Sequence, residues 1–526
     1  MDRDAMRSYM YPLIDGQPAR AYQQGAIQRC IFQNTLVALP TGMGKTLIAV
    51  VVMANYARWF PNSLAIFLAP TRPLVAQQTQ ACSGMLQMNG STPPKSREVL
   101  WNDARFVFST PQVLQNDLSA GTLSLSNAKR ISLIVIDEAH RATGKYAYGE
   151  SISKLYMLHH GHEAPIFNPL QPAPPIPFRV MALTATPGSN IDAVREIINR
   201  LHIAHIFLRT EESLDVVPYI HGRRIEEIGI DLPPWLLAAR DCLATVMRRS
   251  INILCNTCHA MQDPGELKRL SGYQLRLDRD RFFARQRGSS TNMNATRISS
   301  EFTVAISLAH IMQLLSEHVS KQSIAGNSAK AAMSHQPIYS LTHPGFLGHP
   351  KLEKLVQIVK EHFETAVGTN DSESTRIIVF SQYRGSVSEI VDVLRNVSPL
   401  IKCEQFIGQS NINAGSSDMR GQTQKEQLAV MNRFRNGQTN VIVATCVGEE
   451  GLDIGEVDLI INYDAPSSPI RLLQRIGRTG RARRGKVVVF LAKDTREENS
   501  YKRAQRDYKS VQAKIASGKG IDLRAD

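Results

Sequence analysis

Two segments of this 526-residue chain combine residue types that bind phosphate. The first is Leu39-Pro-Thr-Gly-Met-Gly-Lys-Thr46, and the second, near the other end of the chain, is Gln474-Arg-Ile-Gly-Arg-Thr-Gly-Arg481. Glycines let backbone N–H groups curl around phosphate oxygens, and lysine and arginine side chains supply positive charge. The two segments together predict a binding site for a nucleoside triphosphate. One half of the chain would bind the nucleotide, and the other half would contact its phosphates.

The first segment lies between two apolar runs, Leu36–Leu39 and the run that starts at Thr46. That order predicts a buried strand, a glycine-rich turn and a helix start, which is the context of a phosphate loop. We expect Lys45 to reach the β- and γ-phosphates and the Thr46 hydroxyl to hold Mg²⁺. The strict pattern has glycine where this chain has Leu39, so a chance Gly-Lys-Thr turn is the alternative. The predicted nucleotide-binding residues of this loop are Leu39, Pro40, Thr41, Gly42, Met43, Gly44, Lys45 and Thr46.

An acidic pair follows another apolar run, Leu133–Ile136, in the sequence Asp137-Glu-Ala-His140. Carboxylates at the carboxyl end of a parallel strand lie at the edge where ligands bind in open α/β sheets. We expect Asp137 to hold Mg²⁺, largely through water, and Glu138 to polarise the attacking water. The alternative is an acidic helix start, where Asp and Glu are favoured anyway.

Short polar side chains follow three more apolar runs, which end at Ala69, Ser109 and Leu183. The segments that follow them are Pro70-Thr71-Arg72, Thr110-Pro-Gln112 and Thr184-Ala-Thr186. Such groups suit the phosphate oxygens of a nucleic-acid backbone, although Thr and Pro also simply end strands. Their serial order along one predicted sheet favours the first interpretation.

The second half carries a similar arrangement after the apolar run Val441–Ala444. Thr445 follows this run and is placed to bond a backbone phosphate of nucleic acid. Gly451 and Asp453 come next, and we expect them near the nucleotide cleft.

Arg478 and Arg481 lie three positions apart, so on a helix they share a face. Two guanidiniums on one face can bind γ-phosphate oxygens when two domains close, and such arginine fingers raise rates by about 10³–10⁵-fold. Gln474 completes the candidate catalytic set of this segment. A basic surface helix is the alternative, but Gly477 and Gly480 suit an ordinary helix poorly and permit close approach to a ligand.

The composition favours a folded protein with a polyanionic partner. Hydrophobic residues make up 43% of the chain, which is ample for buried cores. The formal net charge of +14 favours nucleic acid as the partner, although such charge also aids solubility. No apolar run reaches the length of a membrane span, and Thr46–Ala57 is expected to be a buried helix, so no membrane partner is predicted. The first residues lack the basic and apolar regions of a signal peptide.

Seven scattered cysteines, an odd number, favour a reducing compartment. Cys255-Asn-Thr-Cys258-His259 matches the spacing of haem attachment, and its cysteine pair also suggests zinc. No second Cys/His pair follows at zinc-site spacing, so we interpret the segment as a helix that carries two thiols.

The order of signals divides the chain into segments. Residues 1–16 form an N-terminal extension, 17–210 a first αβ unit, 211–345 a helical insert and linker, 346–495 a second αβ unit, and 496–526 a basic C-terminal helix. The proline-rich stretch Pro165–Pro177 is expected to be a surface loop, and Lys321–Pro350 a mobile connection. In the insert, strand signals stop and arginines from Arg223 to Arg287 gather. They favour a nucleic-acid clamp, with a solvated helical face as the alternative.

The chain resembles the superfamily 2 DExH helicases. The motifs that carry this resemblance are Leu39–Thr46, Asp137–His140, Thr184–Thr186, Thr445–Asp453 and Gln474–Arg481. Within that superfamily the chain is similar to the Fanconi anaemia group M family, which includes fungal mutator-phenotype helicases and archaeal Hef. The closer likeness is carried by Arg20-Ala-Tyr-Gln23, Trp59-Phe-Pro61, Val135–His140, Val447–Asp458 and Ser468–Arg471. It spans about 17 to 510 and is weakest from 211 to 345.

The resemblance implies an α/β fold of two RecA-like parallel-sheet motor domains with an α-helical insert domain between them. It implies ATP and Mg²⁺ as cofactors, with Arg20 and Gln23 at adenine, since an amide can bond the adenine edge twice. It also implies that Thr71, Arg72, Thr110, Gln112 and Thr445 line a DNA track. Members of the family move 3′ to 5′ along DNA and remodel forks and displacement loops during repair, and the fungal and animal members are nuclear.

The expected partners are therefore single-stranded and branched DNA and the proteins of a repair complex. This chain ends soon after the second αβ unit and lacks a Glu-Arg-Lys nuclease signature, so neither partner recruitment through a tail nor nuclease activity is implied. Two alternatives stay open. One is a DExH ATPase stimulated by double-stranded RNA, because RNA-sensing helicases share the motor. The other is a DNA-binding scaffold without turnover, although the presence of Lys45, Asp137, Glu138, Arg478 and Arg481 argues against it.

Overall fold

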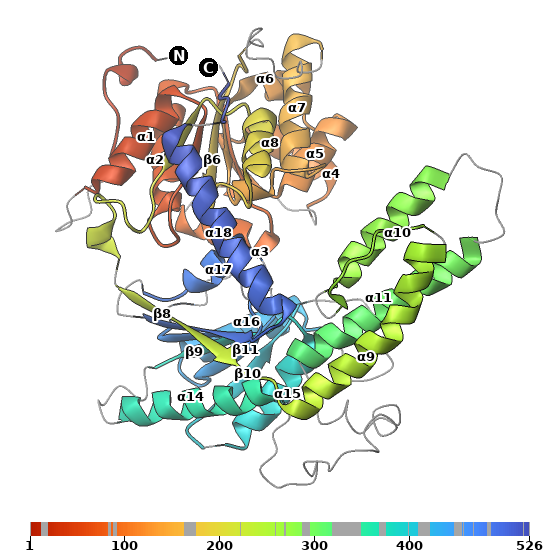
Figure 1. The fold of residues 1–526 in the computed structure, drawn as a ribbon. Coiled ribbons are helices and arrows are strands. Elements are labelled where there is room, and N and C mark those ends of the chain that lie inside the picture. The colour runs from red at the N-terminus through yellow and green to blue at the C-terminus, as the bar shows by residue number, and fades with distance from the viewer. Residues whose placement is uncertain are drawn as a thin grey trace.

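The structure is a computed structural model, and it contains two parallel β-sheets flanked by helices and a helical arm. The described residues are 2–11, 19–82, 86–87, 92–162, 175–220, 222–257, 259–267, 270–286, 295–317, 349–367, 375–397, 399–408, 421–445, 455, 457–466, 468–480, 485–518 and 520–524. Most of the proline-rich stretch and almost all of the segment expected to be a mobile connection lie outside these residues. Figure 1 shows the first sheet above the second, with the arm projecting to one side.

The first sheet has seven parallel strands in the order β3-β4-β2-β5-β6-β1-β7. They are β1 (Thr35–Ala38), β2 (Leu64–Leu68), β3 (Leu86–Gln87), β4 (Phe106–Ser109), β5 (Ile131–Ile136), β6 (Arg179–Thr184) and β7 (His205–Leu208). Because successive side chains of a strand point to opposite faces, Leu36 and Val37 enter two different cores. Both faces are therefore covered, as parallel sheets require.

Helices from both sides of the sheet supply these two cores. The core around Val37 is completed by α1 (Ala21–Phe32), α2 (Lys45–Trp59) and α3 (Arg72–Ala81). The core around Leu36 is completed by α4 (Pro94–Asp103), α5 (Pro111–Ala120), α6 (Leu125–Arg130), α7 (Ala147–His160) and α8 (Ile191–Leu201). Short 3-10 turns lie at Ala5–Arg7 (η1), Ala139–Arg141 (η2) and Val217–Tyr219 (η3). The buried helix predicted at Thr46–Ala57 is confirmed as α2.

The second sheet has six parallel strands in the order β10-β11-β9-β12-β13-β8. They are β8 (Arg223–Ile230), β9 (Ile377–Phe380), β10 (Cys403–Phe406), β11 (Val441–Ala444), β12 (Leu459–Asn462) and β13 (Gly485–Ala492). One core contains α14 (Pro350–Val367) and α15 (Arg384–Arg395). The opposite core contains α16 (Gln424–Arg435), α17 (Pro469–Ile476) and the start of α18 (Arg496–Ser517).

Strand β8 corrects the prediction that strand signals stop from 211 onward. Its eight residues pair in register with the whole of β13, from Arg223 beside Gly485 to Ile230 beside Ala492. It is an edge strand with mostly exposed or half-buried residues, and its sequence Arg-Arg-Ile-Glu-Glu-Ile-Gly-Ile has no continuous apolar run. Pairing with β13 therefore defines this strand, and a search for apolar runs misses it.

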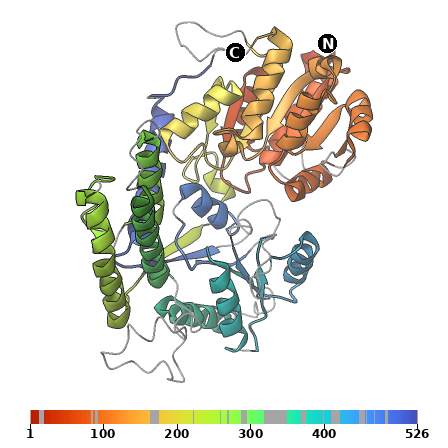
Figure 2. The ribbon, with the colours of Figure 1, turned by 90° about the vertical axis from the view of Figure 1, so that its right-hand side faces the viewer.

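The arm consists of three helices, α9 (Pro234–Asn252), α10 (Gly272–Gln286) and α11 (Ala295–Glu317), with a π-helical turn, η4, at Ile253–Thr257. Figure 2 shows it standing beside the second sheet. Met247, Leu275 and Phe302 meet in its own apolar core, which confirms the predicted helical spacing of this segment. Cys255 lies in the π-helical turn, and Cys258 lies outside the described residues.

One described helix segment, Ala295–Leu315 of α11, is long and apolar enough to cross a membrane, with a mean hydropathy of 1.3. The expectation that no segment of the chain reaches that length and composition is therefore wrong for α11. Phe302, Ala305 and Ala309 pack in the core that α11 shares with α9 and α10. We interpret α11 as the central helix of the arm.

Helix α18 begins in the second αβ unit and ends against the first (Figure 1). Tyr501 near its start is buried in the core of the second sheet, whereas Val511 is buried in a core of the first sheet. Beyond the helix, the Arg524 backbone N–H donates a hydrogen bond to the Ile203 carbonyl at 2.9 Å. The helix and its tail thus form a strap, residues 496–524, that joins the two sheets.

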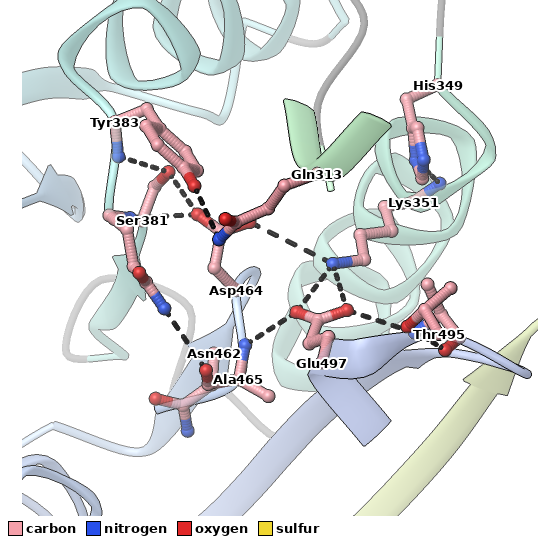
Figure 3. A network of polar contacts seen from close by, with 12 residues as sticks. Gln313, His349, Lys351, Ser381, Tyr383, Asn462, Asp464, Ala465, Thr495 and Glu497 are labelled. Atoms are coloured by element: carbon pink, nitrogen blue, oxygen red, sulfur yellow. Dashed lines mark hydrogen bonds and ion pairs between the residues drawn. The ribbon is translucent and has the colours of Figure 1, made fainter. Parts of the chain in front are cut away.

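The strap starts at a buried ionic network around Lys351 (Figure 3). Lys351, on α14, is fully buried, and its Nζ lies 2.8 Å from both carboxylate oxygens of Glu497 on α18. The same Nζ lies 3.8 Å from Asp464 Oδ1, just beyond β12. Asp464 accepts a hydrogen bond from Ser381 Oγ at 2.6 Å, and Glu497 accepts one from the Ala465 N–H at 2.8 Å. The network therefore joins α14, α18 and the carboxyl ends of β9 and β12.

The arm touches the same region. Gln313 Nε2 of α11 donates a hydrogen bond to the Tyr383 hydroxyl at 3.3 Å, two residues beyond Ser381 (Figure 3). This contact ties the arm to the turn that follows β9.

Replacing Lys351 by methionine should destabilise the second αβ unit by about 3–5 kcal/mol, because Glu497 and Asp464 would remain buried without their cation. Denaturant unfolding measures this change, and Lys360→Met, an exposed position on the same helix, is the matched control. A loss of less than about 1 kcal/mol for Lys351→Met would show that the network is not essential to the fold.

Candidate functional site

The phosphate-loop segment lies between β1 and α2, as the sequence predicts. Gly42 and Gly44 have φ angles of 80° and 77°, the left-handed region that glycine adopts without strain. Lys45 is the first residue of α2, and its Nζ donates hydrogen bonds to the carbonyls of Leu39 at 2.9 Å and Pro40 at 3.1 Å. The loop therefore curls around a lysine ammonium at a helix N-terminus, which is the geometry that holds phosphate.

The start of α1 packs onto this loop. Gln23 Nε2 and the Tyr22 hydroxyl each donate a hydrogen bond to the Met43 carbonyl at 3.1 Å. A Cβ on Gly44 would lie 2.5 Å from Gln23 Nε2, and the φ of 77° at Gly44 makes any other residue strained there. Gln23 is thus placed beside the phosphate loop, where the resemblance also puts an adenine contact.

Arg20 lies next to these residues and stacks on an aromatic ring. Its guanidinium carbon is 4.6 Å from the centroid of the Tyr219 ring, and its Nη1 donates to the Tyr22 hydroxyl at 3.1 Å. The rings of Tyr22 and Tyr219 meet edge to face. Tyr22 and Tyr219 were not predicted as site residues. Tyr22 lies inside the segment that carries the family likeness, whereas no local signal marks Tyr219.

Asp137 lies at the carboxyl end of β5 and is only 8% exposed. Its Oδ1 accepts the Glu138 N–H at 2.9 Å, and the Tyr148 hydroxyl donates to its backbone carbonyl at 2.6 Å. Burial, with help from the Glu138 charge, raises the pKa of Asp137 to about 7, while Lys45 opposes that rise. A buried carboxyl that resists ionisation until a cation arrives is suited to hold a metal ion.

His140 connects the acidic pair, Asp137 and Glu138, to the end of β6. Glu138 has a φ of 50°, an unusual value for a residue with a side chain and one that costs free energy. His140 Nδ1 lies 3.3 Å from both Glu138 Oε2 and Thr184 Oγ1. Burial lowers the pKa of His140, so the imidazole is neutral near pH 7. Thr184 Oγ1 in turn donates to the Thr186 carbonyl at 2.6 Å, so these contacts link the ends of β5 and β6.

The predicted nucleic-acid residues lie after the strands, as expected. Thr71 and Thr110 precede α3 and α5 directly, after β2 and β4, which are neighbours in the sheet. Arg72 and Gln112 are exposed, whereas Thr110 is 9% exposed. Thr445 follows β11 in the second sheet, and its N–H donates to the Phe406 carbonyl at 3.1 Å. The two sheets thus each present polar groups at their carboxyl edges.

The segment after β12 corrects the prediction that Arg478 and Arg481 share a helical face. Helix α17 ends at Ile476, and Arg478 lies in the turn that follows. Thr479 pairs in a parallel bridge with Val457, whose N–H donates to the Arg478 carbonyl at 3.3 Å. This pairing ends the helix before Arg478. Gln474 lies on α17 and is 4% exposed, whereas Gly451, Asp453 and Arg481 lie outside the described residues.

Gly477 brings the second αβ unit into contact with the phosphate loop. A Cβ on Gly477 would lie 1.7 Å from Thr41 Oγ1 and 2.6 Å from Thr41 Cβ, distances that no real side chain adopts. Only glycine fits there while the two units are closed. The residue that follows it is Arg478, so the closed arrangement brings that arginine to the edge of the phosphate loop.

These residues fit a magnesium–triphosphate ligand. The loop glycines and Lys45 are arranged for phosphate, and Asp137 places a buried carboxyl group at the carboxyl end of β5. No cluster of three or more His, Cys, Asp and Glu residues is found in the part of the chain that the structure describes. Asp137 and Thr46 would therefore share Mg²⁺ with phosphate oxygens and water, the usual surroundings of that ion.

Two family models match the two αβ units. Residues 20–194 match the DEAD/DEAH box helicase model, and residues 350–483 match the helicase conserved C-terminal domain model. The helicase domain of Pyrococcus furiosus Hef is 30% identical, with a TM-score of 0.62, and the match covers 93% of this chain and 98% of that domain. The chain belongs to the superfamily 2 helicases, in the family that includes Hef and the fungal Mph1 helicases.

The fungal relatives extend over the whole chain. The ATP-dependent DNA helicases Mph1 of Sclerotinia sclerotiorum and Neurospora crassa are 38% and 39% identical over 100% of this chain. The matched parts are 43% and 45% of those proteins, so the chain spans less than half of their length. The DUF1998 helicase MrfA bound to DNA is 14% identical, covers 95% of this chain and 51% of its own, and has a TM-score of 0.55, which shows a shared fold alone.

Gly477→Ala should lower DNA-stimulated ATP turnover, because the new methyl group would push the second unit away from Thr41 and withdraw Arg478. We expect a loss between about tenfold and 10³-fold, the larger value if the arginine contribution disappears completely. Steady-state ATPase measurements test this. Gly385→Ala, whose Cβ meets no atom within 4 Å, is the control and should keep normal turnover. Normal turnover in Gly477→Ala would show that the closed contact is dispensable.

Magnesium should stabilise the protein more at pH 8 than at pH 6. Between its ordinary pKa of 3.8 and about 7, Asp137 keeps a proton in the folded protein that it would lose when unfolded. Ligand-free stability from this group therefore falls as pH rises through that window. Because Mg²⁺ must displace the proton, its affinity should fall about tenfold per pH unit below 7. Melting temperatures with Mg²⁺–ADP at both pH values, compared with Asp137→Asn, measure the effect. An equal shift at both would contradict it.

Proposed function

We propose that this chain is an ATP-dependent DNA helicase motor that moves 3′ to 5′ and remodels branched DNA. The observation that carries the proposal is the contact between the phosphate loop and the turn that bears Arg478, where only glycine at 477 fits. ATP with Mg²⁺ occupies the cleft between the two units. Its hydrolysis alternately opens and closes that cleft.

Each site residue has a role in this proposal. Lys45 and the loop N–H groups would hold the phosphates, and Thr46 and Asp137 would hold Mg²⁺, which would supply positive charge beside the phosphates. Glu138 accepts a hydrogen bond from the attacking water and orients it. Arg478, with Gln474 and Arg481, stabilises the negative charge that develops on the γ-phosphate. Gln23 and Arg20 surround the adenine, with Gly451 and Asp453 at the cleft.

DNA crosses the carboxyl edges of both sheets in this proposal. Thr71, Arg72, Thr110 and Gln112 contact it from the first sheet, and Thr445 from the second. Because the two groups of contacts lie on separate units, a change in the cleft moves one group along the strand relative to the other. His140 and Thr184 supply the physical link, since they join the acidic pair to the neighbouring strand end.

The direction of movement, the preference for forks and displacement loops, and a role in DNA repair with partner proteins in the nucleus rest on the family. Hef and Mph1 are named as helicases, and the Mph1 relatives as ATP-dependent DNA helicases. The strong positive charge of the chain supports a nucleic-acid partner.

Lys45→Ala should abolish ATP hydrolysis while leaving DNA affinity within about twofold, because the lysine faces phosphate and not the DNA edge. The assay is steady-state ATPase activity with no nucleic acid, single-stranded DNA, forked DNA and double-stranded RNA at one low salt concentration. Lys129→Ala, an exposed lysine in the same unit, is the control.

Stimulation of the unchanged protein by DNA, greatest on forks, is the expected result. Stimulation by double-stranded RNA alone would overturn the DNA assignment. Hydrolysis that no nucleic acid stimulates, or equal rates for Lys45→Ala and the unchanged protein, would overturn the motor itself.

A further inference from the structure

Arg223 stands out because it is a buried arginine of the second unit that contacts the connection leaving the first. It is the first residue of β8, and its side chain is only 5% exposed. The sequence placed it among the arginines of a nucleic-acid clamp, but the structure turns it inward. Its Nε donates a hydrogen bond to the Thr479 carbonyl at 2.8 Å, and its Nη1 pairs with the Glu211 carboxylate. One guanidinium therefore bridges two segments far apart in the sequence.

The first of these segments is the turn that carries Arg478. Thr479 is fully buried, and its hydroxyl donates to the Val457 carbonyl. Gly480 has a φ of 74°, and a Cβ there would lie 2.6 Å from Arg223 Cγ. The Arg223 stem thus lies directly on Gly480 while its guanidinium holds the Thr479 carbonyl. This turn is fixed from two sides within its own unit, by Val457 and by Arg223 on β8.

The second segment is the connection that leaves the first sheet. Glu211 lies three residues beyond β7, the strand that pairs with β1 and so lies beside the phosphate-loop strand. The connection is folded back on itself by the Arg209–Asp215 ion pair at 2.8 Å and by the Thr210 N–H, which donates to Ser213 Oγ at 2.9 Å. Glu211 therefore lies on a compact turn that is held next to the first unit.

We propose that Arg223 is a positioning residue that sets the placement of Arg478 according to the position of the first unit. A displacement of Glu211 pulls the guanidinium, and the guanidinium moves the peptide next to Arg478. Arginine is required because its planar fork donates to a carboxylate and a carbonyl at the same time, whereas lysine offers a single ammonium. The proposal rests on the proposed function, since it assigns a purpose only if Arg478 acts on the nucleotide.

Arg223→Lys is the informative variant, because it keeps the charge and most of the stem on Gly480 but loses the two-way bridge. Glu211→Gln removes the partner charge from the other end. We expect both to lower the DNA-saturated kcat by about tenfold or more, part of the contribution of an arginine finger. KM for ATP, affinity for a non-hydrolysable ATP analogue and melting temperature should change little. The matched control is Arg433→Lys. Arg433 donates two hydrogen bonds to the Glu404 carboxylate away from the cleft, and this variant loses that paired contact.

The decisive comparison combines Arg223→Lys with Arg478→Ala. If Arg223 acts through Arg478, the double variant should be no slower than Arg478→Ala alone. A normal kcat in Arg223→Lys, or a loss that multiplies with that of Arg478→Ala and comes with a lowered melting temperature, would overturn the proposal. If Arg478→Ala and Lys45→Ala both kept full ATPase activity, the proposed function itself would be overturned. This result differs from the two results that overturn only the role of Arg223.

Discussion

The phosphate loop and the turn after α17 approach so closely that residue 477 has no room for a side chain. A Cβ there would lie 1.7 Å from Thr41 Oγ1. Each half of the site is incomplete alone, because Lys45 and Asp137 belong to one unit and Arg478 belongs to the other. In the proposed mechanism, the charge that develops on a transferred phosphate is therefore neutralised from both sides only while the units are closed. Everything else in the fold determines how readily that closure is reached and left.

The strap and the buried ionic network limit the ways in which the units can separate. Helix α18 is buried in the second unit at Tyr501 and in the first at Val511, so hinge motion must bend or slide one long helix. Its start is fixed by Lys351 and Glu497, whose pairing lies at the carboxyl ends of β9 and β12 (Figure 3). The connection that carries Glu211 provides a second, shorter link. Because the strap and this connection differ in length, they favour rotation of one unit relative to the other about a defined axis over free separation of the units.

The sequence predicts the strands that are buried on both faces, such as β1, β5 and β11, because such strands are continuous apolar runs. It misses β8 and β10, whose charged and polar residues form strands through pairing with a neighbour. It also misses β7, a four-residue edge strand that begins with His205. The places of the phosphate-loop segment after β1 and of the acidic pair after β5 agree with the sequence, since their geometry is local. The position of Arg478 is not, because the helix ends where Thr479 pairs with Val457, a contact between segments. Tyr219 and Arg223 depend on the arrangement of both units and leave no local pattern.

The most direct measurement is a structure of the protein with Mg²⁺, a transition-state analogue of ATP and forked DNA. The account predicts that the Arg478 guanidinium lies about 3 Å from the phosphate mimic, opposite Lys45, with Gly477 still in contact with Thr41. An analogue held by Lys45 and Asp137 while Arg478 points to solvent, with the two units apart, would contradict it.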